Sequence, residues 1–190
     1  FSNDGTCHTC RDRTILFLGA RRSDGSTNPA DLMGMPNGLT TGALEAKYGT
    51  TSAIYAEPNR GVITGEDAPM VFQTYAEVEF MMAEAITKGW ASGDAKAHYE
   101  AGVKAAMQML SMLYPNASAV SDAEVATYLA AKPFDASKAL QMIGEQYWAA
   151  TFFNEYEAFA NWRRTGFPVL QPFGGEAIYD GNVTNGTIPR

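Results

Sequence analysis

Hydrophobic and polar positions follow two different patterns along this chain. Between residues 74 and 166, apolar residues recur every three or four positions, which is the spacing of amphipathic helices. Before residue 74 the periodicity is weak, and turn-forming pairs such as Asp24-Gly25 interrupt the chain. The contrast predicts a mainly α protein with long irregular loops. Its predicted parts are a loop-rich segment, a helical region and an irregular tail, at 1–73, 74–166 and 167–190.

The first two predicted helices form a hairpin at 74–114. The first helix carries an apolar face that we expect to be buried, while Glu77, Glu84 and Lys88 face elsewhere. A short turn with two glycines follows, and Asp94 can cap the second helix. The residues expected to be buried are Tyr75, Val78, Met82, Ala85 and Ile86 in the first helix, and Tyr99, Val103, Ala106, Leu110 and Leu113 in the second.

Three further helices are predicted before the tail. Ser121 and Glu124 have the spacing of a capping box, in which each side chain satisfies a backbone N–H group of the other residue. Gly166 is suited to end the last helix. The third helix is predicted to start at Ser121 and to end before Pro133, the fourth to run from Asp135 to about Phe153, and the fifth from about Glu155 to Thr165. The buried line of the fourth helix is Leu140, Ile143, Tyr147 and Ala150.

Composition limits the classes of function. Of the 190 residues, 46% are hydrophobic and 18% are charged, as in a globular protein with a packed core. The formal net charge of -7 argues against a nucleic-acid partner, which would require a basic surface. No apolar stretch approaches the roughly 20 residues that a membrane-spanning helix needs.

The two cysteines form a pattern that resembles a metal or redox motif at first sight. Cys7 and Cys10 are separated by two residues, but a zinc site needs four ligands and no second cluster supplies them. A redox centre would need a strand and helix around the pair, which here lies among loop residues. We expect a local disulfide or simple loop thiols at this position, and neither a metal nor a cofactor.

Glutamates are abundant, so we considered a glycosidase pair. Glu77 and Glu84 are seven residues apart on one predicted helix, about 10 Å along its axis. We interpret them as part of a solvated helix face, and we predict that Glu157 forms an ion pair with Arg163 or Arg164. No catalytic residue is assigned. A small α-helical glycosidase stays as a rival hypothesis.

The segment 145–168 is the most informative stretch of the chain. Aromatic residues at helical spacing lead to Trp162 and then to a basic pair. This segment closely resembles the C-terminal region of the SusD/RagB family, outer-membrane lipoproteins of Bacteroidetes that hold nutrients for a TonB-dependent transporter. Asn161 stands where that family has an acid. The residues that match the family pattern are Gln146, Trp148, Ala149, Phe152, Glu157, Ala158, Trp162, Arg163, Arg164, Thr165, Gly166 and Pro168.

Two further segments support the resemblance. Tyr75–Ala85 is similar to a segment of the family's helical region, and Ala95, Tyr99 and Gly102 fit the second helix of a tetratricopeptide repeat. The resemblance therefore implies a SusD-like α superhelical fold with tetratricopeptide-like hairpins. It also implies that these residues correspond to the C-terminal portion of a longer protein, with the N-terminal half and its lipid anchor outside this chain.

The resemblance also implies a function. We expect non-catalytic capture of a nutrient oligosaccharide or polysaccharide at the outer membrane, on a lipid-anchored protein that is surface-exposed or faces the periplasm. The captured ligand would be delivered to a partner SusC-like, TonB-dependent transporter. A peptide-binding member of the same family and a tetratricopeptide module with only protein partners are the alternatives.

Loop aromatics are the better binding candidates, because loops carry function on a rigid scaffold. Aromatics on predicted helices are expected to lie in the core: Tyr75, Tyr99, Tyr147, Trp148, Phe152 and Trp162. The candidate ligand-binding residues are Asn37, Tyr48, Tyr55, Asn59, Arg60 and Trp90.

Overall fold

A computed structural model describes residues 66–152 and 154–170, together with 21–22, 42, 45–46 and 56–57. The chain divides into two compact units. One is Gly61–Val169, and the other combines Phe1–Arg60 with Leu170–Arg190. In the latter, β1 (Arg21–Arg22) and β2 (Ala56–Glu57) form an antiparallel pair with Arg21 opposite Glu57. Cys7 and Cys10 lie outside the described residues.

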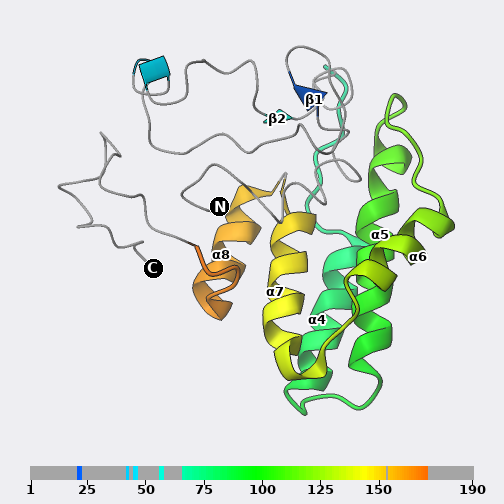
Figure 1. Ribbon diagram of the computed structural model, residues 1–190, viewed down its shortest axis with the longest axis vertical. Coiled ribbons are helices and arrows are strands. Elements are labelled where there is room, and N and C mark those ends of the chain that lie inside the picture. Colours follow the sequence, from blue (N-terminus) through cyan, green and yellow to red (C-terminus); the bar gives the residue numbers. More distant parts are fainter. Residues whose placement is uncertain are drawn as a thin grey trace. The chain divides into compact units, whose positions relative to one another are not determined.

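The unit Gly61–Val169 is helical, which confirms the predicted fold class. Helices α4 and α5 form an antiparallel hairpin, α7 packs on α4, α8 packs on α7, and α6 contacts α5 (Figure 1). None of the described helices is long and apolar enough to span a membrane. The bounds are α4 (Tyr75–Thr87), α5 (Ala95–Leu113), α6 (Asp122–Ala131), the 3-10 helix η2 (Ala136–Lys138), α7 (Ala139–Ala150) and α8 (Glu155–Thr165).

Polar caps fix several of these boundaries. Ser121 and Glu124 form the predicted capping box at the start of α6, and Asp94 caps α5 by accepting from the Lys96 amide at 2.9 Å. Gly166 adopts a left-handed conformation with φ of 79° after α8. The predicted fourth helix differs in detail, because η2 precedes α7 and α7 ends at Ala150.

Close packing between α4 and α5 forms the centre of the core. Phe80, on α4, is fully buried against Gly102 of α5. A Cβ atom at position 102 would lie 2.6 Å from Phe80 Cε1, so only glycine permits this approach. The rings of Tyr99 and Tyr147 lie 6.2 and 6.4 Å from the Phe80 ring. The predicted stripe of α5 is buried as expected, except that Leu113 is half-buried.

The predicted orientation of α4 is wrong. Tyr75 is 65% exposed and Met82 is 38% exposed, whereas Glu77 and Glu84 are buried. Apolar spacing alone failed here because each buried carboxylate has a partner that compensates for its desolvation. Outside α4, Phe152 and Leu140 also proved to be partly exposed, and Tyr99, Tyr147 and Trp162 are buried as predicted.

Candidate functional site

Trp90 is the one predicted ligand-binding residue that the structure describes. It lies in the turn between α4 and α5, where its backbone N–H donates to the Ala85 carbonyl at 2.8 Å. Gly89, with φ of 74°, permits the tight turn. The side chain of Trp90 is 73% exposed. The other candidates lie outside the described residues: Asn37, Tyr48, Tyr55, Asn59 and Arg60.

Lys88 connects this exposed ring to the interior. Its ammonium lies 4.7 Å from the centroid of the Trp90 ring, within the range of a cation–π contact. The same ammonium donates to Glu84 Oε1 at 2.6 Å. The indole is therefore held beside a charge that is itself fixed, and most of its surface stays open to solvent.

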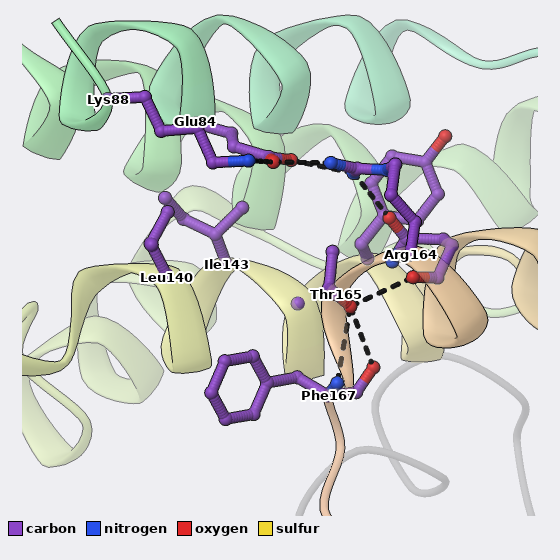
Figure 2. A pocket seen from close by; sticks show the side chains of 10 residues that line it. Glu84, Lys88, Leu140, Ile143, Arg164, Thr165 and Phe167 are labelled. Atoms are coloured by element: carbon purple, nitrogen blue, oxygen red, sulfur yellow. Dashed lines mark hydrogen bonds and ion pairs between the residues drawn. The ribbon is translucent and has the colours of Figure 1, made fainter. Parts of the chain in front are cut away.

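Glu84 is the centre of an ion-pair network between α4 and α8. Arg164 donates from Nη1 to Oε1 at 2.5 Å and from Nη2 to Oε2 at 2.7 Å, so the guanidinium and the carboxylate form a bidentate ion pair (Figure 2). The pKa of Glu84 is lowered, because the bond from Arg164 outweighs the effect of burial. Arg164 was predicted to pair with Glu157, and its observed ion pair is with Glu84. Glu157 instead accepts from the Tyr147 hydroxyl at 2.8 Å.

A cavity of about 110 Å³ lies beside this network. One part of its wall carries the charged groups of Glu84, Lys88 and Arg164, and another part is apolar (Figure 2). It has room for a few water molecules and is smaller than the roughly 300 Å³ at which pockets begin to enclose whole small molecules. The remaining residues of its wall are Leu140, Ile143, Gly144, Tyr147, Asn161, Thr165 and Phe167.

Asn161 is the unusual member of the cavity wall. It is 4% exposed, and its Oδ1 accepts from Arg164 Nη2 at 2.7 Å. This bond assigns the amide orientation, since an NH₂ group cannot accept from a guanidinium. Within the described part of the chain, the Asn161 Nδ2 group is buried and has no hydrogen-bond acceptor. A buried donor without an acceptor is costly and therefore needs an explanation.

A second hollow, of about 510 Å³, lies between the start of α4 and the second half of α5. Its wall is largely apolar, with Met109, Met112 and Leu113 among its residues. Two of the polar side chains that line it are already engaged, because Lys104 and Gln108 both donate to Asp122. This hollow suits apolar groups better than the hydroxyl groups of a sugar.

The carboxylates of the described residues are poorly placed for acid catalysis. A glycosidase needs a carboxylic acid whose pKa is raised so that it can donate a proton. Glu84 is held ionised by Arg164, and the pKa of Glu79 is lowered by hydrogen bonds from Tyr75 and, less strongly, His98. Where a carboxylate pKa is clearly shifted among the described residues, it is lowered. The lowered pKa values leave Glu79 and Glu84 poorly suited to donate a proton.

Comparison with known families decides the identity. Residues 9–190 match the SusD-like model that is described as "Starch-binding associating with outer membrane". The chain belongs to the SusD-like family. This confirms the resemblance found between residues 145 and 168. No curated protein matches the chain.

Solved structures agree with this family. A chitin-binding protein is 29% identical with a TM-score of 0.77, over 94% of this chain and 38% of that protein. A SusD-like protein from Bacteroidetes is 34% identical with a TM-score of 0.61, over 70% and 28% of the two chains. A SusD homologue from Bacteroides fragilis shares the fold at 22% identity, with a TM-score of 0.74 over 96% and 45%. The present chain thus spans less than half the length of each.

The sequence alone did not predict the buried part of this site, which is the ion-pair network of Glu84 and Arg164 and the cavity beside it. Arg164 was noted as the basic end of a helix, but its partner is 80 residues away in the chain and no local spacing indicates it. Asn161 offered a weak signal, since it replaces an acid of the family pattern immediately before Trp162. That substitution leaves an N–H donor where an acid would have supplied a second acceptor for Arg164.

Proposed function

We propose that this protein captures a polysaccharide or oligosaccharide at the outer membrane without cleaving it. The family description and the chitin-binding relative support a carbohydrate ligand. The low carboxylate pKa values support a role without catalysis. Members of the SusD-like family are generally binding proteins.

The exposed indole of Trp90 is the observation that carries this proposal. A sugar ring has an apolar face of C–H groups, which packs well against a flat aromatic ring, and binding sites for small molecules combine aromatic walls with a few polar groups. Lys88 restrains the Trp90 side chain before any ligand arrives, which reduces the entropy lost on binding. Its position on a turn between two packed helices gives the ring a rigid support.

The finer parts of the proposal concern partners and location. We propose delivery of the captured glycan to a SusC-like, TonB-dependent transporter, with the protein held at the outer membrane by a lipid anchor outside this chain. The helical hairpin of α4 and α5 would brace the fold or face the transporter. Asn37, Tyr48, Tyr55, Asn59 and Arg60 stay as predicted contributors to the glycan surface.

Affinity gel electrophoresis tests the capture role. The purified protein is run through gels that contain starch, chitin derivatives or other soluble polysaccharides, and retardation is compared with a gel without glycan. We expect retardation by at least one polysaccharide and its loss in Trp90→Ala. Tyr156→Ala is the matched control, because Tyr156 is an aromatic residue that is 89% exposed on α8. Retardation that Trp90→Ala leaves unchanged would contradict the proposed role of Trp90.

A peptide ligand is the second candidate, favoured by the apolar hollow of about 510 Å³ beside α5. That volume lies within the roughly 300–1,000 Å³ of pockets that enclose small molecules, and its wall suits apolar side chains. Peptides therefore belong in the same binding panel. A peptide that occupies this hollow should lose affinity in Ala105→Phe, which fills it, and keep its affinity in Trp90→Ala.

A further inference from the structure

The backbone of the turn around Trp90 is fixed, whereas the indole ring is largely exposed. The N–H groups of Trp90 and Ala91 both donate to the Ala85 carbonyl, at 2.8 and 3.3 Å. Trp90 itself is 73% exposed, and an aromatic side chain with so little packing can change rotamer unless another group restrains it. Lys88 supplies a restraint, because its ammonium lies 4.7 Å from the centroid of the Trp90 ring.

A lysine alone would restrain the ring only weakly, because its four-carbon chain is flexible and an exposed cation–π contact is weak. Glu84 lies one turn before Lys88 and binds it twice. The Glu84 carbonyl accepts from the Lys88 backbone N–H at 2.9 Å, and Glu84 Oε1 accepts from the ammonium at 2.6 Å. The Glu84 side chain is 10% exposed and is itself held by the bidentate bond from Arg164. The ammonium above the indole is therefore bound to a buried anion that is fixed in turn.

Another lysine–glutamate pair with the same spacing shows how an ordinary exposed pair differs. Lys96 and Glu100, on α5, are 3.7 Å apart, and their side chains are 58% and 37% exposed. Such a pair holds neither side chain in one position, since an exposed ion pair gains little over solvation by water. Lys88 and Glu84 are 2.6 Å apart, and their side chains are 30% and 10% exposed. The shorter and more buried pair can hold its lysine in one rotamer.

We propose that Glu84 is a positioning residue for glycan binding and that it acts through Lys88. Glu84 holds the Lys88 ammonium over one face of the Trp90 indole, so the ring keeps one orientation and offers its opposite face to a sugar. Fixing the ring before the ligand arrives reduces the entropy that is lost on binding. This inference rests on the proposed glycan capture, and it gives Glu84 a role beyond the ion pair that joins α4 to α8.

A double-mutant cycle tests this positioning role. Isothermal titration calorimetry measures the affinity of the purified protein for maltohexaose and chitohexaose, which are soluble fragments of starch and chitin. Glu84→Met and Lys88→Met should each weaken binding about threefold to tenfold, the range expected when one more side chain must be ordered on binding. In the Lys88→Met background, Glu84→Met should weaken binding no further, because its effect passes through Lys88. Losses of affinity that add in the double variant overturn the inference.

Glu100→Met is the matched control, because Glu100 belongs to the exposed lysine–glutamate pair on α5 and the substitution is chemically the same. The variant should bind both hexasaccharides with the affinity of the native protein. A loss in Glu100→Met as large as that in Glu84→Met would overturn the inference, since removing any glutamate would then have the same effect.

A spectroscopic readout starts from the native protein without ligand. The ring current of an indole shifts protons that lie over its face upfield, so the ε-methylene protons of Lys88 should resonate upfield of those of Lys96 in ¹H–¹³C spectra. The upfield shift should disappear in Glu84→Met and persist in Arg164→Met, which keeps the bond between Glu84 and Lys88. An ordinary Lys88 shift in the native protein, or an upfield shift that survives in folded Glu84→Met, overturns the inference.

The outcomes separate this inference from the proposed function. Affinity that falls in Trp90→Ala and stays unchanged in folded Glu84→Met overturns the positioning role and leaves glycan capture standing. Failure to bind either hexasaccharide or any polysaccharide in the gels overturns glycan capture, and with it the role of Glu84 in binding.

Discussion

Helices α4 and α5 form one hairpin but build their buried faces in opposite ways. The buried face of α5 is an ordinary apolar stripe, with Tyr99 and Val103 almost completely inaccessible. The buried face of α4 mixes apolar residues with carboxylates, including Glu77 and Glu84, while Tyr75 faces solvent. A helix can therefore bury its charged side when each carboxylate on that side accepts a hydrogen bond or forms an ion pair.

The partners of the α4 carboxylates come from three directions. Glu77 closes a capping box with Thr74 at the start of its own helix. Glu79 Oε2 lies 2.6 Å from His98 Nδ1 on α5. Glu84 is held by Arg164 on α8. Charged groups therefore tie α4 to α5 and α8, whereas the buried stripe of α5 is apolar, and the two buried faces should respond differently to mutation.

The largest effect should come from removing the partner of Glu84. Arg164→Met leaves a buried carboxylate with Lys88 as its only cation. We expect a loss of between about 2 and 3 kcal/mol in the free energy of unfolding, less than the about 3–5 kcal/mol of a fully buried pair, because the Arg164 side chain is 48% exposed. Urea denaturation followed by circular dichroism measures this loss. Arg163→Met, the exposed neighbour, is the control. Equal losses of unfolding free energy in the two variants would show that the ion pair between Arg164 and Glu84 does not stabilise the fold.

A smaller effect is expected at the contact between α5 and α4. Gly102→Ala places a methyl group 2.6 Å from Phe80 Cε1 and should cost about 2 kcal/mol, in the range for overpacking a core. The Phe80→Leu background relieves the clash, so a double-mutant cycle should give a favourable coupling. If the unfolding free energies lost in the two single variants simply add, Gly102 and Phe80 are not in contact.

Acid should reduce the difference between wild type and Arg164→Met. The pKa of Glu84 in the folded protein is below its ordinary value of 4.5, mainly because of the bond from Arg164. Glu84 thus stabilises the fold above about pH 4.5, and this contribution is lost as the pH falls through the folded value. Arg164→Met lacks most of this stabilisation, because Arg164 is the main cause of the lowered pKa of Glu84. A difference that stays constant from pH 7 to pH 3 would exclude Glu84 as the cause.

The smallest effect is expected on the exposed face of α4. Met82 is 38% exposed, so Met82→Gln should change the free energy of unfolding by no more than about 0.5 kcal/mol. Its neighbour Ala83 is fully buried, and Ala83→Gln should be strongly destabilising because the larger polar side chain has no room. If Met82→Gln were more destabilising than Ala83→Gln, the face of α4 that contains Met82 would be the buried one, as the apolar spacing had predicted.

Local sequence signals determined much of the fold in advance. Asp94, the pair Ser121 and Glu124, and Gly166 each act within a few residues of their own position, and each ends or begins a helix as predicted. The stripe of α5 was predictable because its apolar residues recur at helical spacing, and the residues that are buried, including Tyr99, Val103 and Leu110, are those residues. Even Thr74 and Glu77 show the capping-box spacing in the sequence, and that signal was overlooked.

Local sequence patterns could not predict the orientation of α4 or most of the candidate site. The partners of Glu79 and Glu84 on other helices lie 19 and 80 residues away, so the sequence around each carboxylate does not show that it will be buried. Trp90 was predictable as an exposed aromatic because it follows a glycine turn outside both helices. The cavity at Asn161 is lined by three separate segments, namely α4, α7 and residues 161–167, and only the fold brings them together.

The most direct test of the central claim asks whether a retained glycan is left intact. The protein is incubated to equilibrium with the polysaccharide that retards it most strongly, and the glycan is then examined by mass spectrometry for shortened products. Capture without catalysis predicts a chain-length distribution identical to that of the glycan incubated alone. Accumulation of shorter oligosaccharides, reduced in Glu77→Gln or Glu84→Gln, would contradict the account and identify the protein as a glycosidase.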